Sequence, residues 1–123
     1  MTFLEPIGLP PAVGPYSHAI KHDNTIFLSG QIGIDPLTQK LGETLEEQLN
    51  QILKNMNDFL QHHKLQRKQI VKSSIFVTDL AFFSKVNIAY ENFFTAPYPV
   101  RSTIQVSALP KNALIEIEFL IST

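Results

Sequence analysis

Hydrophobic and polar residues alternate most regularly near the C-terminus, where the segment from Leu114 to Ile121 is predicted to be a β-strand. Successive side chains of a strand point to opposite faces of its sheet. One face is therefore wholly apolar and consists of Ile115, Ile117, Phe119 and Ile121. The other face carries Glu116 and Glu118 between two leucines. That face is too polar for a core and too apolar to stay bare, so we expect a ligand, a second subunit or both to cover it.

Two segments show the periodicity of amphipathic helices. The first begins at Thr44, which can form a capping box with Glu47 three residues later. Its apolar stripe consists of Leu45, Leu49, Ile52, Leu53, Met56 and Leu60, and its solvent side of Lys54, Asn55, Asp58 and Gln61. The second helix is predicted after its capping residue Asp79 and ends before Pro97. Its apolar stripe consists of Phe83, Val86, Tyr90, Phe93 and Phe94, with Asn87 on or beside it.

The other apolar segments are short and are predicted to be strands. They are Tyr16–Ile20 and Thr25–Ser29, joined by a turn at Asp23-Asn24, and then Ile70–Thr78 and Arg101–Ser107. The resulting order is β-β-α-β-α-β-β. This order predicts an α+β two-layer sandwich, with a mixed sheet and both helices on the face that carries Ile117.

Arg101 begins one of these strands, and the residues in phase with it are Thr103, Gln105 and Ser107. We assign all four to the sheet face that carries Glu116. A guanidinium group binds a carboxylate through two parallel hydrogen bonds, so this face is predicted to hold a small carboxylate. Nothing else in the chain remains to cover it, which favours an oligomer that shelters polar pockets between its subunits.

Composition limits the possible functions. The chain has 123 residues, of which 44% are hydrophobic, as expected for a single domain over residues 1–123. It contains no cysteine, which excludes disulfides, thiol catalysis and cysteine-bound zinc. A net charge of -1 provides no basic field to attract nucleic acid or an acidic membrane. We find no apolar run long enough to span a bilayer and no signal peptide at the N-terminus, so we expect a cytoplasmic protein.

Six short motifs, taken together and in this order, resemble the RidA/YjgF family. They are Gly14-Pro15-Tyr16-Ser17, Leu28-Ser29-Gly30-Gln31, Phe76-Val77-Thr78-Asp79-Leu80, Val86-Asn87-Ile88-Ala89-Tyr90-Glu91-Asn92-Phe93-Phe94, Pro99-Val100-Arg101-Ser102, and Leu109-Pro110-Lys111 with Ile115-Glu116-Ile117-Glu118. The resemblance runs from Gly14 to the C-terminus. It implies a chorismate-mutase-like fold and a homotrimer with three sites between subunits. It also implies that reactive enamines and imines, such as 2-aminoacrylate, are hydrolysed to 2-oxo acids and ammonia without a metal or cofactor.

The resemblance further implies roles for single residues. Arg101 would bind the substrate carboxylate, and Glu116 would handle the attacking water or protonate the imine. The pocket would be lined by Tyr16, Ser29, Gly30, Asn87 and Thr103. Thr103 stands where the family often has cysteine; because it keeps a small side chain, we expect activity to be preserved.

The residues alone leave other interpretations open. Arg101 could be a structural ion-pair residue, and Glu118 could take the role given to Glu116. A non-catalytic protein that binds a small carboxylate would need Arg101 but not Glu116.

A third hypothesis is an RNA-directed protein. It depends on a basic cluster of Lys64, Arg67, Lys68 and Lys72, which lacks interleaved aromatic residues and is better explained as a solvated surface. His18 and His22 have the spacing of metal ligands on a helix, but they fall in a predicted hairpin, where that spacing does not bring them together. We therefore expect no metal site.

Overall fold

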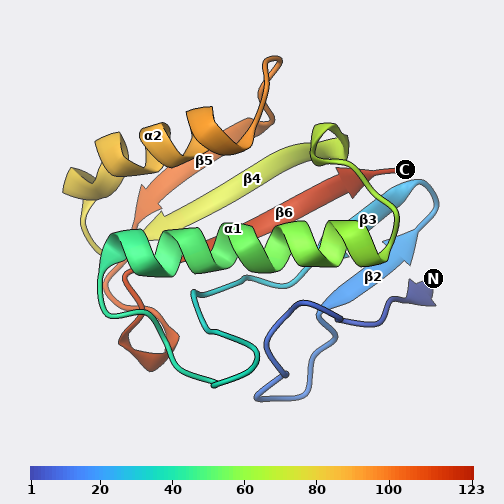
Figure 1. Cartoon of the computed structure of the whole chain (residues 1–123), viewed down its shortest axis with the longest axis horizontal. Helices are drawn as coiled ribbons and strands as arrows, with labels where there is room; N and C mark the ends of the chain where they lie inside the picture. The colour runs from blue at the N-terminus through green and yellow to red at the C-terminus, as the bar shows by residue number, and fades with distance from the viewer.

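The computed structural model describes residues 1–123 and consists of a six-stranded sheet covered by two helices (Figure 1). The strands are β1 (Thr2–Phe3), β2 (Ala19–His22), β3 (Thr25–Leu28), β4 (Ile70–Val77), β5 (Val100–Gln105) and β6 (Ile115–Ser122). Their order across the sheet is β1-β2-β3-β6-β4-β5, and only the β4–β5 pair is parallel. The helices are α1 (Leu45–His62) and α2 (Phe83–Phe93), with short 3₁₀ turns η1 (Arg67–Gln69), η2 (Leu80–Phe82) and η3 (Pro110–Asn112). The predicted α+β fold is confirmed.

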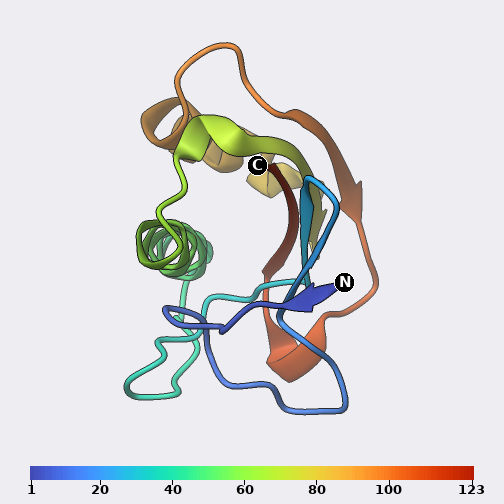
Figure 2. The same cartoon turned by 90° about the vertical axis from the view of Figure 1, so that its right-hand side faces the viewer.

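Both helices lie on the same face of the sheet, which leaves the other face uncovered (Figure 2). The apolar side of β6 points toward the helices, and Ile115, Ile117, Phe119 and Ile121 are all buried. The stripe predicted for α1 is buried against it: Leu45, Leu49, Ile52, Leu53, Met56 and Leu60. The core therefore lies between one sheet face and two helices, as the alternation along β6 and the helical periodicity predicted.

The start of α1 confirms Thr44 as the cap, but Glu47 reaches the amide of Glu43 and not that of Thr44, so the reciprocal half of the box is absent. Thr44 Oγ1 accepts a hydrogen bond from the Glu47 amide at 3.1 Å, and the Glu47 carboxylate accepts one from the Glu43 amide at 2.9 Å. The prediction for Asn55 was wrong, because this residue is buried rather than solvated. Its Nδ2 donates to the Ile34 carbonyl at 2.8 Å and its Oδ1 accepts from Gln51 at 2.7 Å. A buried amide is stable where hydrogen bonds satisfy it, which polarity alone does not reveal.

Several predicted elements differ from the structure in their extent. Strand β1 was not predicted; it pairs with β2 through Thr2–Lys21 and Phe3–Ile20 and is too short for a periodic signal. Strand β2 begins at Ala19, later than the Tyr16 start that was predicted. The Asp79 carboxylate accepts from the Ala81 amide at 2.9 Å, so it caps η2, which leads directly into α2.

The side chains of β5 face the opposite way from the prediction. Arg101 pairs with Ser73 of β4, and Ser73 pairs with Phe119 of β6. Paired residues of neighbouring strands point to the same face. Arg101, and with it Thr103 and Gln105, therefore lies on the helix-covered face and not beside Glu116. The uncovered face of β5 carries the more apolar set, which consists of Val100, Ser102 and Ile104.

Candidate functional site

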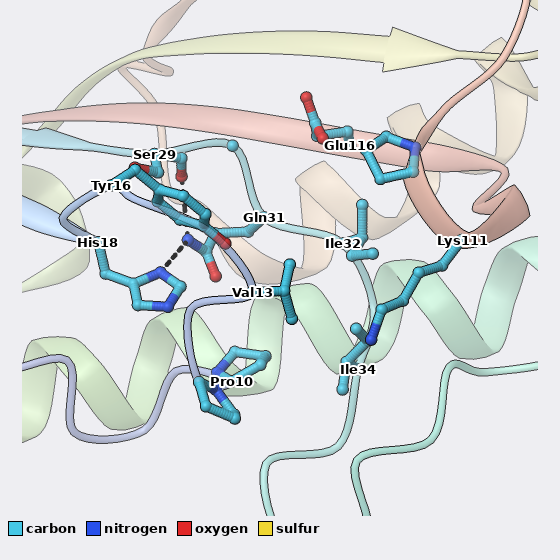
Figure 3. Close-up of a pocket in the computed structure, with 13 residues that line it drawn as sticks. Pro10, Val13, Tyr16, His18, Ser29, Gln31, Ile32, Ile34, Lys111 and Glu116 are labelled. Atoms are coloured by element: carbon cyan, nitrogen blue, oxygen red, sulfur yellow. Dashed lines mark hydrogen bonds between the residues drawn. The ribbon is translucent and has the colours of Figure 1, made fainter.

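A pocket of about 400 Å³ opens between the N-terminal loop, the segment after β3 and the start of β6 (Figure 3). We call it the Glu116 pocket. It brings together four residues that the family resemblance implies, namely Tyr16, Ser29, Gly30 and Glu116. They come from three separate parts of the chain, so the fold itself assembles this half of the predicted site.

Glu116 forms one wall of the pocket and packs against the backbone of Gly30. A Cβ atom at Gly30 would lie 2.7 Å from Glu116 Oε2 and from its Cδ, closer than real contacts allow. Glu116 is half-buried, whereas Glu118 is exposed and lies outside this pocket. Burial, and to a lesser extent the negative charge of Glu118, raises the pKa of Glu116 above the usual range for a glutamate. A carboxyl group with a raised pKa is suited to exchanging protons near neutral pH.

A network of short contacts holds the segment that carries Ser29 and Gly30. The backbone of Gln31 pairs with that of Ile117, with N–O distances of 2.8 and 2.9 Å. The Gln31 amide group donates to the Ser29 carbonyl at 2.9 Å, and its Nε2 lies 3.5 Å from His18 Nδ1. The Ser29 hydroxyl donates to the Ser17 carbonyl at 2.5 Å. Gly30 is therefore fixed in front of Glu116 from both sides.

A second group of predicted residues lies beneath α2, at the edge of the sheet. Arg101 donates a hydrogen bond to Asn87 Oδ1, and its guanidinium lies 5.0 Å from the centroid of the Tyr90 ring and 5.2 Å from that of Phe83. Phe83, predicted to be part of the buried stripe, is exposed instead. A hollow of about 290 Å³ opens beside this group, and Tyr98 also lines it. We call it the Arg101 hollow.

Three hydroxyl groups are buried near Arg101, those of Ser73, Tyr90 and Thr103; the first two lie close together but do not make a hydrogen bond of normal geometry. Burial raises the pKa of Tyr90 to about 12, so this phenol stays protonated. Thr103 lies in the same strand as Arg101, on the same face. The surroundings of Arg101 are thus polar and sheltered, which is suitable for an anion held by a guanidinium.

Glu116 and Arg101 are not brought together within one chain. On β4, which lies between their two strands, Glu116 pairs with Phe76 and Arg101 pairs with Ser73. Glu116 and Arg101 are therefore separated by three residues along the strand direction and by two strand spacings across the sheet. Standard strand dimensions put their Cα atoms about 14 Å apart. Their side chains also point to opposite faces of the sheet. A single small substrate cannot reach both residues of the same chain.

Sequence reasoning missed several residues of the Glu116 pocket. They are Pro10, Pro11, Val13, His18, Gln31, Ile32, Ile34, Pro110 and Lys111. The Pro-rich loop signalled only irregular backbone, and no periodic pattern marks where such a loop packs. Lys111 adopts a left-handed backbone conformation with φ of 56°, which turns the chain at the mouth of the pocket.

In the basic cluster, Arg67 makes contacts within the chain, whereas Lys64, Lys68 and Lys72 are exposed. Arg67 donates to Asn57 Oδ1 at 3.0 Å and to the Phe93 carbonyl at 3.0 Å, and its guanidinium lies 4.1 Å from the Phe93 ring centroid. It therefore ties η1 to both helices.

No group of three or more His, Cys, Asp or Glu residues is placed to hold a metal ion. Neither helix is long and apolar enough to cross a bilayer.

Comparisons of the sequence and of the structure with known proteins relate this chain to a single family. The sequence model of a family described as Endoribonuclease L-PSP matches residues 7–122. Reactive Intermediate Deaminase A, chloroplastic, from Arabidopsis thaliana is 50% identical over 110 residues, which cover 89% of this chain and 59% of that protein. The human 2-iminobutanoate/2-iminopropanoate deaminase is 41% identical over 110 residues, covering 89% of this chain and 80% of that protein. The crystal structure of RidA from an Antarctic Psychrobacter superposes with a TM-score of 0.95 and 34% identity over 100% of both chains.

Proposed function

Because this chain belongs to the RidA/YjgF family, we propose that it hydrolyses reactive enamine and imine intermediates to 2-oxo acids and ammonia. The proposed substrates are 2-imino acids such as 2-iminopropanoate, the imine tautomer of 2-aminoacrylate. The carbon that reacts keeps its oxidation state throughout, so the reaction consumes only water. A carboxylate anchor, a group that transfers protons and a sheltered pocket are sufficient for it.

In the proposed mechanism, the guanidinium of Arg101 binds the carboxylate of the imino acid through two hydrogen bonds. A water molecule adds to the carbon of the protonated imine, C=NH2⁺, and Glu116 accepts a proton from that water. The carbon then carries a hydroxyl and an amino group. Glu116 gives this proton to the nitrogen, the C–N bond breaks and ammonia leaves, while the hydroxyl proton passes to Glu116 as the carbonyl of the 2-oxo acid forms.

We propose that the complete site forms between two copies of the chain in a homotrimer. The Glu116 pocket of one copy would face the Arg101 hollow of its neighbour. This proposal is supported by the separation of Arg101 and Glu116 on opposite sheet faces. It is also supported by the uncovered sheet face, where Phe27, Val100 and Ile104 are exposed to 47%, 67% and 51%. Exposed apolar residues of this number on one face favour burial against another protein surface.

The observation that carries the catalytic proposal is the state of Glu116. A half-buried carboxyl group with a raised pKa, held against Gly30 in a mainly apolar pocket, is the arrangement expected for a proton-transfer group. A protein that only binds carboxylates would have no need for it.

The test is the acceleration of ammonia release from imines that an amino-acid oxidase generates in the same solution. We expect the wild type to accelerate release above the spontaneous rate. Glu116→Gln should lose about 10²-fold or more of this acceleration while still binding a 2-oxo acid. If the wild type binds 2-oxo acids but does not accelerate ammonia release, the protein is a carboxylate-binding module and the proposed function is wrong.

A further inference from the structure

The Glu116 pocket is larger than the smallest proposed substrate requires. Its volume of about 400 Å³ falls in the range of cavities that enclose drug-sized ligands. The imine of alanine brings only a methyl group as its side chain. Since a water molecule takes about 30 Å³ of liquid volume, a methyl group would leave most of the pocket to water.

Most of the pocket wall is apolar. Six of the thirteen residues that line it have hydrocarbon side chains: Pro10, Pro11, Val13, Ile32, Ile34 and Pro110. Figure 3 shows Ile32 beside Glu116, with Val13 and Ile34 lying farther from Glu116 in the pocket. Lys111 also lines it, but this residue is exposed, so its aliphatic stem can line the wall while its ammonium group stays in water.

The wall that contains Ile34 is held in place by helix α1. The Ile34 carbonyl accepts a hydrogen bond from the buried Asn55 of α1 at 2.8 Å. Next to it, Gly33 lies so close to α1 that a Cβ atom there would be 2.3 Å from the Gln48 carbonyl oxygen. Because Ile34 is fixed on α1, this wall of the pocket is preformed rather than created by its ligand. A preformed apolar pocket favours ligands that fill it.

From this geometry we infer that the chain prefers 2-imino acids with branched or thioether side chains, of the size of leucine or methionine, over the imine of alanine. The inference rests on the proposed deaminase function. The side chain of a 2-imino acid is attached to the carbon that reacts beside Glu116, so it starts at the mouth of the apolar part of the pocket. Three additional buried carbon atoms correspond to about a 10- to 50-fold preference.

The first experiment measures binding, without chemistry. The dissociation constants of pyruvate and of 4-methyl-2-oxopentanoate, which share the carboxylate and differ in the side chain, are determined by isothermal titration calorimetry. We expect the larger 2-oxo acid to bind about 10- to 50-fold more tightly. Equal dissociation constants would overturn the inference.

Two variants with the same chemical change locate the preference. Val13 is 71% exposed, so Val13→Asp should fold normally while it introduces a carboxylate into the pocket wall. Leu37→Asp makes the same kind of change at a residue that is 93% exposed and does not line the pocket. We expect Val13→Asp to reduce the ratio of the pyruvate and 4-methyl-2-oxopentanoate dissociation constants to about threefold or less, and Leu37→Asp to leave this ratio unchanged. A preference that survives Val13→Asp would overturn the assignment to this pocket.

The second experiment compares ammonia release from the imines of leucine, methionine and alanine, each generated in situ by an amino-acid oxidase. A kcat/KM that is at least about 10-fold higher for the two larger imines supports the inference. Equal acceleration with all three imines overturns the inference and leaves the proposed function intact. Failure to accelerate release from any of them overturns the proposed function, and the inference with it.

Discussion

Replacing Gly30 with alanine should disable the site without unfolding the protein. Gly30 does not have a left-handed backbone conformation, so an alanine there suffers only from the position of its Cβ atom. That atom would lie 2.7 Å from Glu116 Oε2 and Cδ. Ordinary contacts between heavy atoms are about 3.5–4.0 Å, so the Glu116 carboxyl group has to move by about 1 Å.

A displacement of this size affects chemistry more than folding. Misplacing a catalytic group by about 1 Å can cost about 10²-fold in rate. The carboxyl group lies at the end of a flexible side chain and can turn away, so we expect the free energy of unfolding to change by less than about 1 kcal/mol. Gly30→Ala should therefore show about 10²-fold slower imine hydrolysis with a nearly unchanged melting temperature.

Two other glycines provide matched controls. At Gly14 a Cβ atom would lie 3.6 Å from the Tyr16 ring, an ordinary contact, so Gly14→Ala should be neutral. At Gly33 it would lie 2.3 Å from the Gln48 carbonyl oxygen, so Gly33→Ala should destabilise the fold by about 1–3 kcal/mol.

The three variants are compared by ammonia release and by thermal unfolding. If Gly30→Ala acts through Glu116, it should cost little further activity when it is added to Glu116→Gln. Wild-type activity in Gly30→Ala, or a full additional loss in the double variant, would refute this explanation of Gly30.

Three more predictions follow from single contacts. Arg101→Ala should nearly abolish hydrolysis of imines that carry a carboxylate, and Arg101→Lys should be strongly impaired because lysine lacks the planar guanidinium fork. Ammonia release measures the activity of both variants, and gel filtration should show that both keep their assembly. The Glu118 carboxylate raises the pKa of Glu116, so Glu118→Gln should lower that pKa and move the Glu116-dependent limb of the pH–rate profile to lower pH; an unmoved or upward-shifted limb would contradict the electrostatic coupling. Asn55→Ala leaves the Ile34 carbonyl without its donor and should cost about 1–3 kcal/mol in chemical denaturation, whereas Asn50→Ala, on the exposed side of α1, should cost much less.

Elements with a clear period were predictable from the sequence. The alternation along β6 predicted which of its faces is buried, and the capping box at Thr44 predicted where α1 begins. Glu116 and Glu118 have the same phase, however, so alternation cannot separate them. They differ because Gly30 and the N-terminal loop enclose one of them, and that packing comes from distant parts of the chain.

The orientation of β5 was not predictable from its own residues. We assigned Arg101 to the sheet face that carries Glu116, yet strand register puts Arg101 on the helix-covered face. Arginine is stable there because Asn87 accepts a hydrogen bond from it and aromatic rings of α2 lie against it. The sequence pattern of a strand identifies its two faces, but the partners that each face meets depend on the tertiary structure.

The central claim, that one site uses Arg101 from one chain and Glu116 from another, can be tested by mixing subunits. The Arg101→Ala and Glu116→Gln proteins, each expected to be nearly inactive, are mixed in equal amounts, unfolded and refolded together. Each variant refolded alone is the control. If the two residues come from different copies, random assembly restores both native residues in about a quarter of the sites, and about a quarter of wild-type activity returns. If both residues act within one chain, no site regains the pair, and the mixture stays as inactive as its two parents.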